Sequence, residues 1–198
     1  MKRYQMPLEP GKYYHIYNHA NGDDLLFREP SNYEFFIDNY IKYLSGWMDM
    51  YSYCLLPNHF HMLIKSKSEV VLNSCNIIKS SNELITSQFR KFFQSYSQTF
   101  NRSYDRIGSL FMQNFKRKEV DTDDYFVTLI LYIHLNPVNH GYVEDLNNWN
   151  FTSYFDIINN ENHLVSSEKV INKFGGLSNF NLYHQRNIFK GLTDLLEK

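Results

Sequence analysis

The sequence is poor in the features that mark disulfide-bonded, membrane-spanning or secreted proteins. Its two cysteines, Cys54 and Cys75, form no CxxC pair and are typical of buried thiols in a reducing compartment. This argues against a disulfide framework and against a cysteine zinc site. No apolar run approaches the roughly 20 residues that span a bilayer, and no signal-peptide pattern is present. We therefore expect a soluble, cytoplasmic protein without a membrane partner.

An excess of charge is also absent. The chain has 20 Lys and Arg residues against 21 Asp and Glu residues, which gives a net charge of -1. A molecule with this balance has no general attraction for a polyanion, so any nucleic-acid site has to be local. No GxxxxGK[ST] phosphate loop occurs either, so ATP-driven chemistry is not indicated.

What the chain does have is hydrophobic and aromatic side chains. Of its 198 residues 43% are hydrophobic, which is enough for one core, and 16 Tyr and 16 Phe make it unusually aromatic. Such a composition suits a packed core or a surface that stacks on bases. Core packing is the favoured interpretation.

The hydrophobic pattern predicts four strands and three helices. Strands are predicted where short aromatic or alternating segments are bounded by turn residues, at 13–19, 50–56, 59–65 and 115–120, with a hairpin turn at 57–58. A first helix is predicted to follow an N-cap at Ser31, with Glu34 three residues later, and to end at Gly46. A second helix is predicted over 82–101, and a third from Asp123 to a stop at Pro137.

The order of these elements predicts the fold class and the domain organisation. Strand, helix, strand, strand, helix, strand is the order of a ferredoxin-like α+β sandwich, with helices on one face of an antiparallel sheet, and an extra C-terminal helix follows. Residues 1–155 form the predicted domain. Residues 156–198 are Asn-rich and poorly periodic, and are predicted as an appended tail with a short helix at 187–196.

A pair of histidines in the third predicted strand is a candidate metal site. Residues two apart in a strand point to the same face, so His59 and His61 can reach one metal while Phe60 turns into the core. Two neutral imidazoles suit Mn, Zn, Co or Ni, and Mg would need oxygens as well. On its own this pattern is weak evidence for a metal, and two ordinary histidines are the favoured interpretation.

The last predicted helix adds a phenol and an amide. Tyr132 and Asn136 are four residues apart and share one helix face, whereas His134 lies off that face and is interpreted as a bystander or a phosphate contact. Taken alone, Tyr132 is better interpreted as one more packing residue of an amphipathic helix.

A local basic patch lies between the last two helices. Five cations against Asp105 and Glu119 give +3 within residues 101–119, and Tyr104, Phe111 and Phe115 are interleaved with them. A groove that follows a phosphate backbone and stacks on bases needs this combination, which is also compatible with a solvated loop. The candidate DNA-binding cations are Arg102, Arg106, Lys116, Arg117 and Lys118.

Two motifs in order give the chain a family resemblance. Residues 57–64 (PNHFHMLI) and 132–138 (YIHLNPV) resemble the single-tyrosine transposases of the insertion-sequence-200-like family, and most of all the REP-associated branch. Residues 14–18 (YHIYN), 108–111 (GSLF) and 149–154 (WNFTSY) add to the resemblance. It covers roughly residues 10 to 155.

The resemblance implies an HUH endonuclease fold and assigns roles to residues. The metal histidines fall on His59 and His61, and the nucleophile falls on Tyr132. Asn136 takes the place of a polar residue, often Gln, that completes the metal site in the insertion-sequence members, and its shorter side chain leaves the third ligand open. His15 and Asn18, at the end of the first strand, are further candidates for lining the site.

The implied reaction is cleavage and rejoining of single-stranded, hairpin-associated DNA through a 5'-phosphotyrosine, with divalent Mg or Mn. The chain would act as a monomer or as a homodimer that exchanges its last helix. Three alternatives stay open: a domesticated, inactive hairpin-binding protein, a metal-dependent phosphodiester hydrolase that also uses His15 or His19, and an ordinary α+β domain with chance histidines. An RNA-binding module is disfavoured, because no segment has the required glycine and aromatic spacing.

Overall fold

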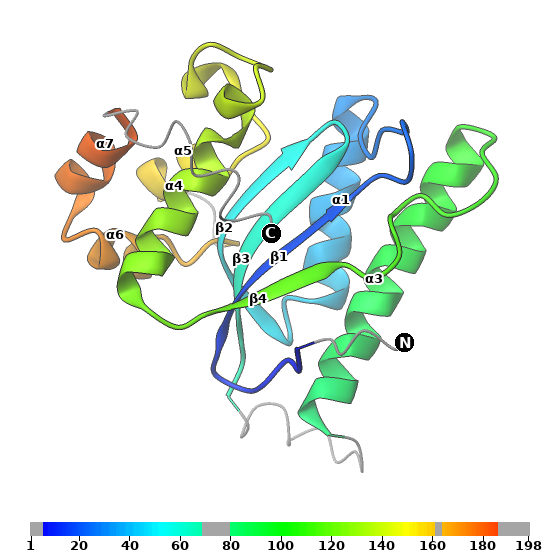
Figure 1. Cartoon of the computed structure of the whole chain (residues 1–198), viewed down its shortest axis with the longest axis horizontal. Helices are drawn as coiled ribbons and strands as arrows, with labels where there is room; N and C mark the ends of the chain where they lie inside the picture. Colours follow the sequence, from blue (N-terminus) through cyan, green and yellow to red (C-terminus); the bar gives the residue numbers. More distant parts are fainter. Residues whose placement is uncertain (1–5, 69–79, 161–163, 186–198) are drawn as a thin grey trace.

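The protein is built on one four-stranded antiparallel sheet (Figure 1). The computed structural model describes residues 6–68, 80–160 and 164–185. The strands are β1 (Tyr13–His19), β2 (Met48–Leu56), β3 (His59–Ser66) and β4 (Lys116–Val120). They lie in the order β2-β3-β1-β4, and every neighbouring pair is antiparallel. The two edges of this sheet are therefore β2 and β4.

Helices cover both faces of the sheet. Helices α1 (Pro30–Tyr43) and α3 (Ser81–Ser103) pack side by side on one face, where Phe60 of β3 lies 5.0 Å from Phe36 and 6.0 Å from Phe93 between ring centroids. Helix α4 (Asp123–Asn139) covers the other face, where Tyr132 lies 5.3 Å from His61. The predicted ferredoxin-like order with an extra helix is confirmed.

Local chemistry explains where the helices begin and end. Ser80 and Glu83 form a capping box that begins α3, in which Ser80 Oγ accepts from the Glu83 N–H and the Glu83 carboxylate accepts from the Ser80 N–H. Helix α1 begins at Pro30 after Glu29, so the predicted Ser31 cap is wrong by two residues. Proline suits the first turn because its missing N–H would have no intrahelical partner there.

The predicted stop at Pro137 is also wrong, because α4 continues to Asn139. Pro137 lies in the last turn, where its ring costs one intrahelical hydrogen bond. Carbonyl groups at the helix end find donors in the following residues: the Asn136 carbonyl accepts from the His140 N–H at 3.0 Å, and the Pro137 carbonyl accepts from the Tyr142 N–H at 2.9 Å.

The region after α4 packs closely against the rest of the chain. It contains η1 (Leu146–Asn148), α5 (Tyr154–Asn159), α6 (Ser167–Lys173) and α7 (Leu177–Gln185), which the weak periodicity of the sequence did not reveal. Ile157, Val170 and Phe180 from these helices are buried in the same core as the sheet. The predicted helix at 187–196 lies outside the described residues.

The segments between these helices cover the outer edge of β2. The Leu55 N–H donates to the Phe151 carbonyl at 2.9 Å, and the Ser153 N–H donates to the Tyr53 carbonyl at 3.0 Å. Further along, the Ser166 N–H donates to the Met50 carbonyl at 2.9 Å. These bonds pair three backbone groups along the outer edge of β2. None of the helices in the described part of the chain has the length and apolar character to cross a membrane.

Candidate active site

The strand register places a row of aromatic and imidazole rings on the α4 face of the sheet. His59 and His61 of β3 lie directly opposite His19 and Tyr17 of β1. The His59 and His19 rings are stacked at 4.7 Å, and those of His61 and Tyr17 at 5.5 Å. Since residues two apart in a strand share a face, His15 extends the row, and its Nε2 lies 2.9 Å from His61 Nδ1.

Helix α4 lays Tyr132 and Asn136 over this row. The Tyr132 ring lies 5.3 Å from that of His61 and 6.2 Å from that of His15, with near-perpendicular planes. One turn later, Asn136 Oδ1 lies 3.0 Å from His59 Nε2. The two motifs, some 70 residues apart in the sequence, therefore meet. Tyr132 is only 1% exposed and Asn136 is fully buried.

Burial keeps three imidazoles of this site, those of His15, His59 and His61, neutral. It lowers the pKa of His59 to about 3, with His19 as a secondary cause, and it lowers the pKa of His15 to about 3, with Lys118 contributing. The pKa of His61 is lowered well below its ordinary 6.5, again mainly by burial. A metal needs the neutral form of a histidine ligand, so these side chains are ready to coordinate at neutral pH.

The polar neighbours of His59 are those expected of a metal-binding histidine. Its Nδ1 lies 2.7 Å from Asn58 Oδ1 and its Nε2 lies 3.0 Å from Asn136 Oδ1, although a neutral imidazole carries one N–H for two acceptors. If Nδ1–H donates to Asn58, the lone pairs of His59 Nε2 and Asn136 Oδ1 face each other. A shared cation satisfies both, and Asn58 then fixes the tautomer of the ligand.

The chemistry of the donor set sets limits on the ion. Within the described residues no group of three or more His, Cys, Asp or Glu side chains is arranged to hold a metal. His59, His61 and the amide oxygen of Asn136 would supply two nitrogens and one oxygen. This set suits Mn or another borderline ion, and Mg would draw its remaining oxygens from substrate and water.

Two of the predicted cations border the site. Lys116 lies opposite Tyr17 in the sheet and Lys118 lies opposite His15, so both are on the face that carries the histidines, and both are exposed. Arg117 is opposite Ile16 and points to the other face, where its guanidinium lies 5.3 Å from the Phe115 ring. Because side chains alternate along β4, Arg117 lies on the opposite face of the sheet from Lys116 and Lys118.

The structure places the remaining predicted cations away from the histidines. Arg106 is bound to Asp24, with Nε 3.0 Å from the carboxylate. Arg102 lines a hollow of about 310 Å³ on the outer side of α3 together with Lys91. Asn18 lies opposite Phe60, on the α1 and α3 face, and its amide donates to the Met112 carbonyl at 3.2 Å. Of the two residues predicted at the end of β1, the structure brings His15 to the site.

Sequence reasoning gave no role to Tyr17 and His140, which belong to the same ring cluster. Tyr17 follows His15 by two positions, so strand alternation was the signal that could have found it. His140 caps the end of α4, and its ring lies 4.9 Å from that of His59. The predicted stop at Pro137 would have ended the helix before His140, so nothing in the sequence indicated that His140 lies near His59.

His134 lies in a second buried network, on the side of α4 turned toward the tail. Its Nδ1 lies 2.8 Å from His184 Nε2, and its Nε2 lies 3.0 Å from Ser52 Oγ and 2.8 Å from Ser153 Oγ. His184 Nδ1–H donates to the Phe180 carbonyl at 2.7 Å. Because that carbonyl can only accept, His134 Nδ1–H donates to His184, and His134 Nε2 accepts from a serine hydroxyl. His134 is fully buried and does not contact phosphate from this position.

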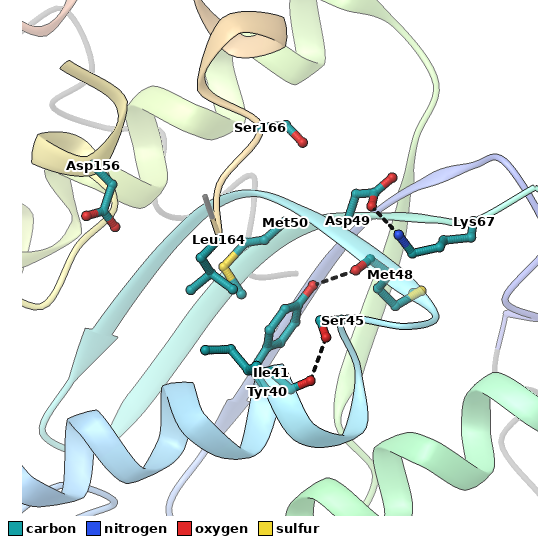
Figure 2. A pocket seen from close by; sticks show the side chains of 10 residues that line it. All are labelled: Tyr40, Ile41, Ser45, Met48, Asp49, Met50, Lys67, Asp156, Leu164 and Ser166. Carbon is teal, nitrogen blue, oxygen red and sulfur yellow. Dashed lines mark hydrogen bonds and ion pairs between the residues drawn. The ribbon is translucent and has the colours of Figure 1, made fainter. Parts of the chain in front are cut away.

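A hollow at the opposite edge of the sheet from β4 has none of this chemistry. It has a volume of about 730 Å³ and lies between β2, α1 and the tail (Figure 2). The Tyr40 hydroxyl donates to the Met48 carbonyl at 3.2 Å, and Lys67 is paired with Asp49 at 2.8 Å. Tyr40, Asp49 and Lys67 are thus already engaged in contacts within the protein.

Comparisons with known proteins agree with this architecture. No protein-family model matches the chain. Over 80% of its length it matches the solved structure of a REP-associated tyrosine transposase bound to a REP hairpin, with a TM-score of 0.65, 16% identity and 86% of that chain covered. The protein therefore has the mixed α+β fold of the REP-associated tyrosine transposases.

A curated sequence relative points to the same group. A Haemophilus influenzae protein that is provisionally named a REP-associated tyrosine transposase is 27% identical over 101 residues, which are 51% of this chain. The match spans 56% of that relative's length. The resemblance to REP-associated tyrosine transposases, expected from the two motifs, is thus confirmed in sequence and in fold.

Proposed function

We propose that the protein is a DNA strand transferase that cleaves and rejoins single-stranded, hairpin-associated DNA through Tyr132. The observation that carries the proposal is the meeting of Tyr132 and Asn136 of α4 with His61 and His59 of β3. A phenol faces a histidine pair suited to a divalent metal, which is the arrangement that the resemblance to HUH enzymes implies. REP-associated transposases in the comparisons support DNA as the partner.

In the proposed reaction the Tyr132 oxygen attacks a phosphodiester phosphorus. A bond forms between that oxygen and the phosphorus, the bond to the 3' oxygen breaks, and the products are a 5'-phosphotyrosine and a free 3'-hydroxyl. The bond energy stays in the covalent intermediate, so rejoining needs no ATP. The phenol must lose its proton, and His15, which lies beside its ring and is not one of the proposed metal ligands, is the candidate base.

The metal site and the lysines have separate roles. His59, His61 and the Asn136 oxygen would hold a divalent ion such as Mn or Mg, which when bound supplies charge stabilisation at the non-bridging phosphate oxygens. Lys116 and Lys118 lie at the same face and are placed to hold the adjoining phosphates. Asn58 fixes the orientation of His59. The chain would act in this way as a monomer or as a homodimer.

The burial of Tyr132 makes access part of the mechanism. At 1% exposure the ring is covered in this conformation, so the DNA strand can reach it only if α4 or its surroundings shift. Binding energy from the hairpin and its phosphates can drive that shift, and the phenol is shielded from solvent until the strand arrives.

The proposal is tested by looking for the covalent intermediate. Wild-type protein is incubated with labelled hairpin DNA from the flanks of its gene and with Mn or Mg, then separated by denaturing electrophoresis. We expect labelled protein, and we expect the label to disappear in the Tyr132→Phe and His59→Ala variants. Tyr125→Phe, on the same helix, is the matched control and should keep the label.

The alternatives give different results in the same experiment. DNA that is bound by every preparation and never linked would support an inactive hairpin-binding protein. DNA that is cut with multiple turnover and without linkage would support a hydrolase, for which the adjacent His15 and His19 are the additional candidates.

A further inference from the structure

A hollow next to the start of β4 has the chemistry of a site for one nucleobase. It has a volume of about 580 Å³ and lies between α3 and the segment 109–115, and we name it the α3 hollow. Phe93, Phe111 and Phe115 form its apolar wall, and Arg90, Gln94, Gln113 and Asn114 are exposed at its rim. Its volume is within the range of roughly 300–1,000 Å³ that is typical of small-molecule sites.

The segment that forms one side of the α3 hollow is held in place by the strand next to the candidate active site. The Met112 N–H donates to the His19 carbonyl at 2.9 Å, and Phe111 forms an isolated bridge with Ala20. The Asn18 amide donates to the Met112 carbonyl at 3.2 Å. The hollow is therefore fixed relative to β1, which carries His15 and His19.

The polar groups of the rim match a neutral base with an attached phosphate. Each amide of Gln94, Gln113 and Asn114 offers a donor and an acceptor, which is the pattern that the hydrogen-bonding edge of a base requires. The aromatic wall offers apolar contact to a base of any sequence. Arg90 is the one cation among the lining residues in the described part of the chain, and none of them is acidic.

The position of the α3 hollow suits a strand that crosses the edge of the sheet. The segment 109–115 leads directly into β4, an edge strand whose Lys116 and Lys118 are on the histidine face. A DNA strand held by these lysines reaches the rim of the hollow by passing over the β4 edge. Phosphate contacts and a base site would then follow one another along the strand.

We propose that the α3 hollow binds a single unpaired base of the DNA strand that the protein acts on. The inference rests on the proposed function for its substrate class and adds a base-reading site outside the catalytic cluster. The phosphates on the lysines position the strand, and the amides at the rim of the hollow distinguish the base.

The test uses hairpin DNA whose unpaired flank carries 2-aminopurine at one position at a time, without metal, so that binding is measured without cleavage. With the wild-type protein, we expect the fluorescence emission of 2-aminopurine to change strongly at one position of the DNA flank. Ser97→Phe, which fills the hollow from α3, should abolish that change while the hairpin still binds.

Matched variants measure the contribution to affinity. Gln113→Ala should weaken binding of the preferred strand about tenfold and reduce the preference at that one position. Gln98→Ala, on the outer side of α3, should change neither the affinity nor the preference. Arg90→Ala should weaken binding more than Lys91→Ala, because Lys91 is adjacent in sequence and lines the hollow on the outer side of the helix.

Three results would overturn the inference: equal emission changes at all unpaired positions, no effect of Ser97→Phe on the responsive position, or equal affinities for Gln113→Ala and Gln98→Ala. These results differ from failure of the proposed function. Hairpin binding with a single base position engaged but no covalent protein–DNA product would overturn strand transfer and support the α3 hollow.

Discussion

The buried histidine network between α7 and α4 predicts a specific loss of stability in acid. Burial lowers the pKa of His184 from its ordinary 6.5 to about 4, an effect that its hydrogen bond with the Phe180 carbonyl only partly opposes. His184 is 6% exposed, so solvent screens this shift little. The folded protein therefore holds a neutral imidazole that the unfolded chain protonates readily.

The sign and the size of the effect follow from linkage. Below pH 6.5 the unfolded chain binds the proton and the folded protein does not, so stability is complete above pH 6.5 and is lost progressively as the pH falls toward 4. At pH 5 a pKa of 6.5 in the unfolded chain and about 4 in the folded protein corresponds to a loss of about 2 kcal/mol from this one side chain.

The measurement is urea unfolding at pH 8 and pH 5 for the wild type and for His184→Gln. We expect the free energy of unfolding to fall between these pH values by about 2 kcal/mol less in the variant, since it lacks the titrating imidazole. Val170→Ala, in the buried face of α6, is the destabilised control. It should lose stability at both pH values without a change in the difference.

Equal pH differences in the wild type and His184→Gln would refute this reasoning, because they would mean that His184 binds a proton equally in the folded and unfolded states. Loss of the same pH difference in Val170→Ala would also refute it, since the effect would then follow from general destabilisation.

Other features make independent predictions. Lys118→Gln should reduce the slope of log binding constant against log salt concentration by about 1 for all DNA sequences, whereas Lys42→Gln, on α1, should leave it unchanged. Burial raises the pKa of the Cys54 thiol, so in a Cys75→Ser background iodoacetamide should modify the protein only after unfolding, and rapid modification of the folded protein would contradict this. Ser80→Ala should lower the free energy of unfolding by about 1 kcal/mol in a urea titration, while Ser80→Thr should retain most of it; equal losses would exclude the cap as the cause.

The sequence predicted the sheet and the meeting of its motifs well, because these depend on local patterns. Strand β1 lies at its predicted limits, and alternation in the segment 59–65 places His59 and His61 on one face. The i, i+4 spacing likewise places Tyr132 and Asn136 toward that face.

What the sequence could not show depends on long-range pairing. The opposition of His59 to His19 follows from the β1–β3 register, which no single segment specifies. Arg117 was grouped with Lys116 and Lys118 because they are adjacent in sequence, although strand alternation separates them onto two faces. The helices of the tail are short and bury single side chains such as Phe180 against α4, so they lack the periodicity of an amphipathic helix.

The paired outer edge of β2 has a consequence for self-association. An exposed edge strand is a template for pairing with another chain, and here segments after α4 bond to the β2 edge, while β4 forms the other edge. Two copies that approached each other through β4 in an antiparallel arrangement would bring Lys116 and Lys118 of each close together, and like charges would oppose the contact. The same lysines would thus keep the sheet from growing between molecules and leave that edge open to a polyanion.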